Sequence, residues 1–153
     1  MYSRILVGFD GSPAAESALR HAAALATRSG AALCVAHVVD MGLRPIGSAL
    51  GLDLGASGDA RREAGRATIA RAAAIAVEAG LQAESRLLET ASPTEGVADI
   101  LAEAAEECRA DLVVLGTHGR TGLQKLIMGS TADGVARRAL VPVLLVPSPD
   151  EGG

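Results

Sequence analysis

The chain alternates between short apolar runs and longer, alanine-rich segments with helical periodicity. The apolar runs predict five strands, at residues 4–9, 31–39, 81–88, 111–115 and 141–146, and the segments between them predict four helices, at 14–29, 59–79, 94–109 and 131–140. Runs such as Arg4–Phe9 and Ala31–Val39 are continuously apolar, which indicates strands covered on both faces. Such strands belong in the middle of a parallel sheet.

Helix start and stop signals agree with this division. Ser12 followed by Pro13 is an N-cap with proline in the first turn, and Ser92 with Pro93 repeats the pattern. Gly30 and Gly80 follow two of the helical segments directly, in the position of glycine C-caps. Each helix is therefore expected to end just before a strand begins.

Two strands differ from the central ones in a way that indicates sheet edges. Residues 81–88 alternate between apolar and polar side chains, and Pro142 interrupts the run Val141–Val146. With right-handed crossovers, the order β-α-β-α-β-α-β-α-β predicts a single-domain α/β fold, with an open parallel five-stranded sheet, strand order 3-2-1-4-5 and helices on both faces. In such a Rossmann-like sheet the ligand site lies where the strand order reverses, between the first and fourth strands.

Three separate stretches are expected to meet at that point: Gly8-Phe9-Asp10, Val38-Val39, and the glycine-rich stretch Gly116–Ser130. Glycines bring bare backbone close to an anion, and Gly129-Ser130-Thr131 offers N–H groups and hydroxyls at a helix N-terminus. Arg120 and Lys125, the latter the only lysine of the chain, add positive charge. This predicts a phosphate site.

A simpler interpretation of the same stretch stays open. In it Gly116 and Gly119 only permit a tight turn, and Ser130 is an ordinary N-cap. The pattern GxxxxGK[ST] is absent from the chain, and GxGxxG does not follow the first strand, so a phosphoryl-transfer site built on those motifs is disfavoured.

The spacing Gly-x2-Gly-x9-Gly-Ser at Gly116, Gly119, Gly129 and Ser130 resembles the signature of the ATP-binding branch of the universal stress protein family. The likeness extends to residues 7–12, 37–40 and 142–147, and so covers essentially the whole chain. It implies a universal stress protein domain at residues 1–148. Residues 41–58 are then a lid or flexible loop, rich in glycine and nearly uncharged, and 149–153 a disordered tail.

The resemblance also implies roles for individual residues. Asp10 would contact the ribose, or a Mg²⁺ ion bridging to phosphate, and the Val38 backbone would recognise the adenine edge. The glycines with Ser130 and Thr131 would hold the ribose and phosphates, and Val141–Val146 would form a homodimer. Asp10 alternatively caps the first helix from just outside Ser12. The full predicted set is Gly8, Phe9, Asp10, Val38, Leu115, Gly116, His118, Gly119, Arg120, Met128, Gly129, Ser130 and Thr131.

Three functions follow from these expectations. The first is a stress-response regulatory module that binds ATP, or ADP or AMP, with little or no hydrolysis. The second is a slow ATPase or adenylate-forming enzyme that uses Mg²⁺ placed by Asp10 and Ser130, although no base is evident to orient a nucleophile. The third is a nucleotide-free dimeric interaction module, against which the intact Gly116–Ser130 spacing weighs.

Composition narrows the remaining possibilities. The 153-residue chain has a formal net charge of −4 and no long basic run, so nucleic-acid binding is not expected. Cys34 and Cys108 lack metal-ligand and CxxC spacing, and we expect reduced, packed thiols in a cytoplasmic protein. His37 and His118 have no partner at ligand spacing and are expected to be structural or rim residues. No apolar run approaches the ~20 residues of a membrane span.

Overall fold

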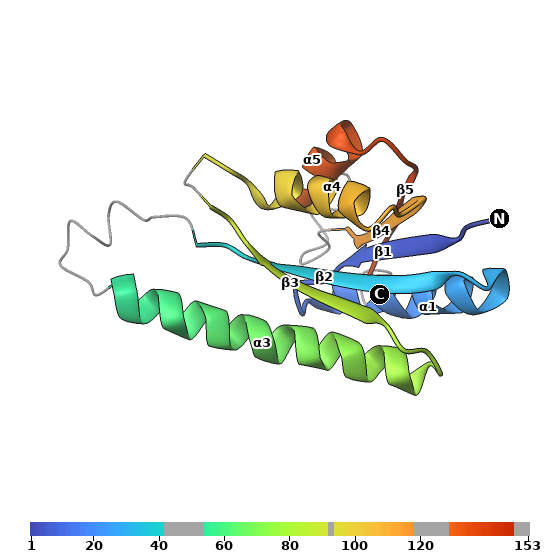
Figure 1. Cartoon of the computed structure of the whole chain (residues 1–153), viewed down its shortest axis with the longest axis horizontal. Coiled ribbons are helices and arrows are strands. Elements are labelled where there is room, and N and C mark those ends of the chain that lie inside the picture. The colour runs from blue at the N-terminus through green and yellow to red at the C-terminus, as the bar shows by residue number, and fades with distance from the viewer. Residues whose placement is uncertain (42–53, 92–93, 118–128, 149–153) are drawn as a thin grey trace.

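The computed structural model describes residues 1–41, 54–91, 94–117 and 129–148 (Figure 1). Its elements in chain order are β1 (Arg4–Gly8), α1 (Pro13–Ser29), β2 (Ala32–Val39), α3 (Leu54–Glu78), β3 (Glu84–Glu89), α4 (Val97–Glu107), β4 (Leu112–Gly116), α5 (Ser130–Arg138) and β5 (Val143–Val146). The five strands form one parallel sheet in the order β3-β2-β1-β4-β5. The predicted fold class and strand order are confirmed.

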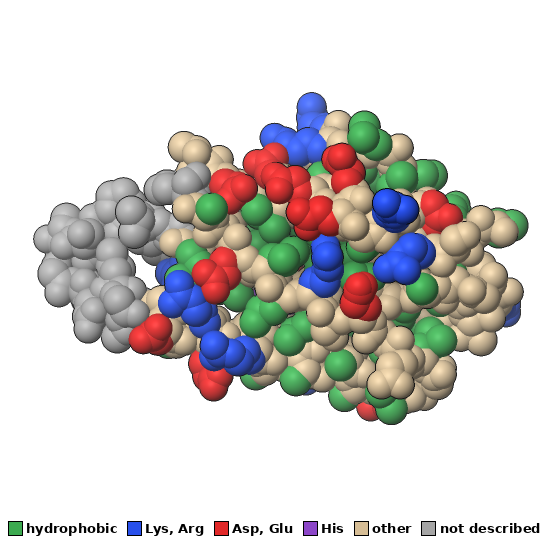
Figure 2. Space-filling view, viewed as in Figure 1, with side chains coloured by type: hydrophobic (Ala, Val, Ile, Leu, Met, Phe, Trp, Pro, Cys, Tyr) green, Lys and Arg blue, Asp and Glu red, His purple; other side chains and the backbone are tan. Residues whose placement is uncertain are grey.

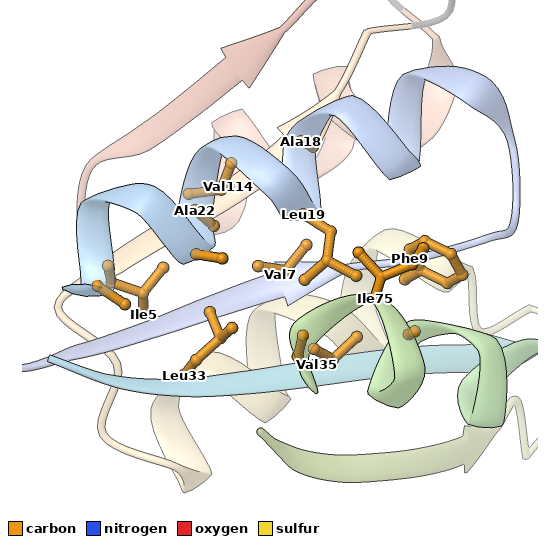
Figure 3. Close-up of a cluster of buried hydrophobic side chains, with 14 of the residues drawn as sticks. Ile5, Val7, Phe9, Ala18, Leu19, Ala22, Leu33, Val35, Ile75 and Val114 are labelled. Carbon is orange, nitrogen blue, oxygen red and sulfur yellow. The ribbon is translucent and has the colours of Figure 1, made fainter. Parts of the chain in front are cut away.

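The helices cover the two faces of the sheet in pairs, with α1 and α3 on one side and α4 and α5 on the other (Figure 1). Successive residues of the central strands therefore enter opposite cores. Ile5 and Val7 join Leu19 and Ile75 on the α1 and α3 side (Figure 3), whereas Leu6 packs on the α4 and α5 side. This two-sided burial explains why the strand runs are continuously apolar.

Small residues let the helices approach the sheet and each other closely. A Cβ at Gly65 of α3 would lie 2.6 Å from Val39 Cγ2, and a Cβ at Gly134 of α5 would lie 2.5 Å from Ala98 Cβ of α4. Both distances are too short for a methyl group to fit at either position unless the neighbouring atoms move. The core is thus built from small side chains, and close packing replaces large aromatic filling.

The caps predicted for α1 and the C-cap predicted for α3 have the expected geometry. The Ser12 Oγ accepts a hydrogen bond from the Ala15 N–H at 3.1 Å, and Gly30 and Gly80 have φ of +70° and +84°, a conformation that favours glycine. The start predicted for α4 at Ser92 and Pro93 is wrong: the N-cap is Gly96, whose N–H donates to the Asp99 carboxylate at 3.2 Å, and the helix begins at Val97. Pro142 stands just before β5, and its carbonyl accepts from the Val113 N–H at 3.0 Å. Proline is tolerated here because its missing N–H lies at a strand start.

Several predicted boundaries need correction. Helix α3 begins at Leu54, so residues 54–58 are helical and do not belong to a loop; Gly55 and Gly58 lower the helix propensity of that turn and hide it in the sequence. β3 begins at Glu84 because the Leu81 N–H still donates to the Ala76 carbonyl at the end of α3. Most of the remaining part of the lid predicted at 41–58 is residues 42–53, and the predicted tail is residues 149–153. Both segments lie outside the described residues.

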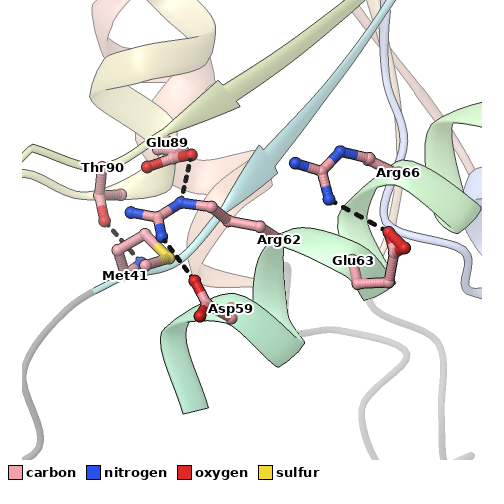
Figure 4. Close-up of polar contacts among 7 residues, drawn as sticks. All are labelled: Met41, Asp59, Arg62, Glu63, Arg66, Glu89 and Thr90. Atoms are coloured by element: carbon pink, nitrogen blue, oxygen red, sulfur yellow. Dashed lines mark hydrogen bonds and ion pairs between the residues drawn. The ribbon is translucent and has the colours of Figure 1, made fainter. Parts of the chain in front are cut away.

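Most charged side chains of the described residues form ion pairs. Basic and acidic side chains are interspersed over the face shown in Figure 2. Arg86 reaches Glu107 at 3.3 Å, and Arg62 of α3 joins Glu89 of β3 at 2.9 Å (Figure 4). Within the described part of the chain, no helix combines the length and apolar character that crossing a membrane requires.

Candidate functional site

A crevice of about 860 Å³ opens at the carboxyl ends of the strands, where the strand order reverses. It is bounded by the ends of β1, β2, β4 and β5 and by the first turns of α1, α4 and α5. Its lining includes Gly8, Phe9, Asp10, Val38, Leu115, Gly116, Gly129, Ser130 and Thr131. These nine predicted residues come from three distant parts of the sequence and lie in one crevice.

The remaining predicted residues cannot be placed in this crevice. His118, Gly119, Arg120 and Met128 fall within 118–128, outside the described residues, as does Lys125. Their predicted roles stay predictions.

Near the end of β2, the backbone of Val38 has no partner among the described residues on the side that faces the crevice. The Ala36 carbonyl accepts from the Phe9 N–H at 2.8 Å, so Ala36 faces β1. Because backbone groups alternate in direction along a strand, the N–H and C=O of Val38 also face the β1 side, but β1 ends at Gly8. Val38 therefore offers a donor and an acceptor beside the Val38, Leu101 and Leu115 side chains.

His37 fixes the geometry of this corner. Its Nδ1 lies 2.7 Å from the Phe9 carbonyl oxygen. A carbonyl only accepts, so Nδ1 carries the proton and donates. The His37 ring thus holds the chain just after β1, which is the structural role expected for it.

Asp10 shapes the turn that leads into α1. Its Oδ1 accepts from the Ser12 N–H at 2.9 Å, and Gly11 between them has φ of +81°. The N-cap contact itself is made by Ser12, so Asp10 supports the turn from outside the cap, as the structural alternative proposed. Among the described residues, Asp10 Oδ2 has no hydrogen-bond partner, and this oxygen remains free to bind a hydroxyl or an ion.

The N-terminus of α5 is open. Gly129 is the N-cap and makes no side-chain capping bond, and Ser130 is the first helical residue. The interpretation of Ser130 as an ordinary N-cap is therefore wrong. The N–H groups of Ser130, Thr131 and Ala132 have no partner within the helix, and they concentrate the positive end of the helix dipole at the crevice.

The opposite wall combines the predicted Gly116 with Thr117 and Ser148, which the sequence prediction missed. Gly116 contacts the α1 backbone so closely that a Cβ would lie 2.5 Å from the Ala14 carbonyl carbon and oxygen. The Thr117 N–H donates to the Val146 carbonyl at 2.9 Å, and Ser148 lines the crevice two residues after β5. No motif distinguishes Ser148, because only the end of the neighbouring strand brings it there.

The described residues bring few groups for metal or acid-base chemistry to the crevice. Asp10 is the only carboxylate among the described lining residues, and the described residues contain no cluster of three or more metal-binding side chains. A Mg²⁺ ion held here would take most of its ligands from a bound phosphate and water. The protein groups fit an ion that arrives with a nucleotide better than a resident metal.

The two cysteines lie outside the crevice, on the α4 and α5 side of the sheet. Both are free and buried. Burial, followed by the neighbouring Cys108, raises the pKa of the Cys34 thiol to about 12. Cys34 is consequently a packed thiol and a poor nucleophile near neutral pH.

The sheet order and the crevice at its switch point define an α/β protein of the doubly wound, Rossmann-like class. The model of the universal stress protein family matches residues 1–147. The chain belongs to this family. It is 31% identical to universal stress protein MJ0531 of Methanocaldococcus jannaschii, over 97% of this chain and 84% of that protein.

Two solved structures of similar proteins carry ligands. One is a universal stress protein in complex with cAMP, with 29% identity, a TM-score of 0.68, and coverage of 96% of this chain and 98% of that one. The other is the universal stress protein from Archaeoglobus fulgidus in complex with dAMP, with 26% identity, a TM-score of 0.70, and coverage of 95% and 98%. Both ligands are adenine nucleotides.

Proposed function

We propose that this protein is a regulatory module of the stress response that binds an adenine nucleotide, with ATP as the first candidate, and hydrolyses it slowly or not at all. The proposal is carried by two features of the crevice: at one end, an apolar slot beside backbone groups that have no partner among the described residues, and at the other end, an open helix N-terminus. The complexes of two relatives with cAMP and dAMP support the same ligand class.

The apolar end suits a purine base. Val38, Leu101 and Leu115 are each less than a tenth exposed and line the slot. A base placed there exchanges hydrogen bonds with the N–H and C=O of Val38, and selectivity comes from this backbone edge. Stacking is not required: Phe9 is the only Phe, Tyr or Trp of the described lining, and it is buried in the core on the α1 and α3 side.

The polar end suits phosphate. The N–H groups at the start of α5 can donate hydrogen bonds to an anion, and Ser130 and Thr131 add hydroxyls. Asp10 is repelled by a bare phosphate, so its role is to bind the ribose hydroxyls or a Mg²⁺ ion that travels with the nucleotide. Gly119 and Arg120 complete this end in the proposal.

Slow turnover follows from the same residues. Asp10 is the only carboxylate in the described lining, and the Nδ1 of His37 is engaged with the Phe9 carbonyl. Hydrolysis needs a group that orients the attacking water. The free Oδ2 of Asp10 favours a slow Mg²⁺-dependent ATPase as the second candidate function.

We also propose a homodimer through Val141–Val146, in the cytoplasm. β5 pairs with β4 on one side only, and its four residues are only partly buried in the single chain. An unpaired strand edge is a surface on which a second copy can add.

The decisive experiment is to purify the protein, denature it, and separate the released small molecules by chromatography. Co-purified ATP supports the regulatory module, whereas ADP together with measurable turnover supports the ATPase. If nothing is released, and titration calorimetry with ATP, ADP and AMP detects no binding, the proposal is refuted and the nucleotide-free dimer takes its place.

A further inference from the structure

Ser148 has a buried hydroxyl that the described residues leave without a hydrogen-bond partner. Among the described residues only Thr90 and Ser148 are buried polar side chains, at 5% and 6% exposure. Thr90 Oγ1 accepts a hydrogen bond from the Met41 N–H at 2.8 Å (Figure 4). Ser148 Oγ has no partner among the residues that the structure describes. A buried hydroxyl without a partner is costly, so the structure leaves room for a bound group to supply one.

The position of Ser148 tells which part of a ligand it meets. Val38, Asp10, Gly116 and Ser148 follow or end four adjacent strands, in the sheet order β2-β1-β4-β5. Strands lie about 4.8 Å apart, so Ser148 is on the order of 14 Å across the sheet from the base slot at Val38. Only the part of a nucleotide farthest from its base extends that far.

The surroundings of Ser148 suit an anion. Helix α1 packs against β5, and the N-terminal turn of α1 lines the same wall as Thr117 and Ser148. Two helix N-termini, those of α1 and α5, therefore face the polar part of the crevice. The only carboxylate of the described lining, Asp10, follows β1, which lies on the other side of β4 from β5.

We propose that the Ser148 hydroxyl donates a hydrogen bond to an outer phosphate of a nucleoside di- or triphosphate bound in the crevice. The contact makes the end of β5 a specificity element that favours ATP and ADP over nucleoside monophosphates. This inference rests on the proposed function, because it requires the base to occupy the slot at Val38.

The test compares Ser148→Ala with the parent protein by titration calorimetry with ATP, ADP and AMP, at fixed salt and excess Mg²⁺. The matched control is Ser85→Ala, which removes an exposed hydroxyl from β3 at the opposite edge of the sheet. Loss of one hydrogen bond to a charged oxygen weakens ATP binding about tenfold or more. The affinity of Ser148→Ala for AMP should change less than about twofold. The affinities of Ser85→Ala for all three nucleotides should also change less than about twofold.

Thermal unfolding without nucleotide provides a second measurement. Removing an unpartnered hydroxyl should leave the midpoint of the Ser148→Ala variant equal to or above that of the parent. A lower midpoint would show that the hydroxyl has a structural partner and would overturn the inference. Equal loss of ATP and AMP affinity, or no loss of ATP affinity, would overturn it as well. If the parent protein binds neither nucleotide, the proposed function itself has failed, and this result precedes any comparison of variants.

Discussion

The contact between Gly116 and the first turn of α1 leads to a sharp prediction about stability. Gly8 and Gly116 end neighbouring strands, and both line the crevice. A Cβ at Gly116 would lie 2.5 Å from the backbone carbon and oxygen of Ala14. A Cβ at Gly8 would lie 2.6 Å from Leu115 Cδ2, the far end of a flexible side chain. The two glycines therefore face clashes of similar distance with partners of different rigidity.

Replacing each glycine with alanine separates these two cases. Overpacking typically costs about 1–3 kcal/mol. Gly116→Ala should fall at or above the upper end, about 3 kcal/mol, because the α1 backbone has to move, and Gly8→Ala near the lower end, about 1 kcal/mol, because a leucine rotamer can adjust. For a chain of this size a loss of about 3 kcal/mol lowers the unfolding midpoint by roughly 6–12 °C.

Urea denaturation of both variants and the parent measures the difference directly. The midpoints convert to free energies of unfolding if the slopes agree. We expect Gly116→Ala to be the less stable variant and to bind nucleotide more weakly, since α1 and β4 both border the crevice. This prediction is refuted if Gly116→Ala unfolds at the same urea concentration as the parent, or at a higher urea concentration than Gly8→Ala. In that case the close approach of β4 to α1 does not stabilise this wall of the crevice.

Three further predictions concern single side chains. Ser12→Ala removes the N-cap of α1 and should cost about 1 kcal/mol in urea denaturation; a cost near zero would contradict the capping role. Cys34 should react slowly with iodoacetamide at pH 8 in the native state and rapidly in urea. Because its pKa is raised in the folded state, the parent protein should lose stability from about pH 9 toward 12, and the Cys34→Ala variant should not show this loss. Hydrogen bonds from the N–H groups of Ser3 and Arg4 hold the pKa of Asp111 below its usual value. The stability that the Asp111 carboxylate contributes is therefore present at neutral pH and is lost as pH falls below about 4. Asp111→Asn should flatten the low-pH part of a plot of unfolding free energy against pH.

The sequence predicted the sheet almost completely because the strand signals depend on burial. Continuous runs identified the two-sided central strands, and the alternation of 81–88 and Pro142 identified the edges. Boundaries were predicted less well wherever a hydrogen bond outside the local pattern decided them. Leu81 looked like the start of a strand, but its N–H completes the C-terminal turn of α3.

The site was predictable where sequence motifs and strand ends coincide. Asp10, Val38, Gly116 and Ser130 all follow from the switch-point argument and the glycine spacing. Ser148 was not predictable in this way. A serine between two prolines near the C-terminus has no local signal, and its burial is visible only once β5 is paired with β4.

The unequal lengths of β1 and β2 explain how an otherwise regular sheet presents a recognition edge. β2 continues through Val39, while β1 pairs with it only as far as Gly8 opposite Ala36. β3 accompanies β2 on its other side up to Glu89, so the Val38 backbone groups that lack a partner among the described residues face the crevice. The Phe9 carbonyl, which would continue the ladder, is engaged by the His37 ring. If the pairing of β1 with β2 extended by one residue, the backbone N–H and C=O of Val38 would be engaged by β1, while every side chain of the crevice stayed the same. The position at which β1 ends should therefore control base recognition as much as the residues that line the slot.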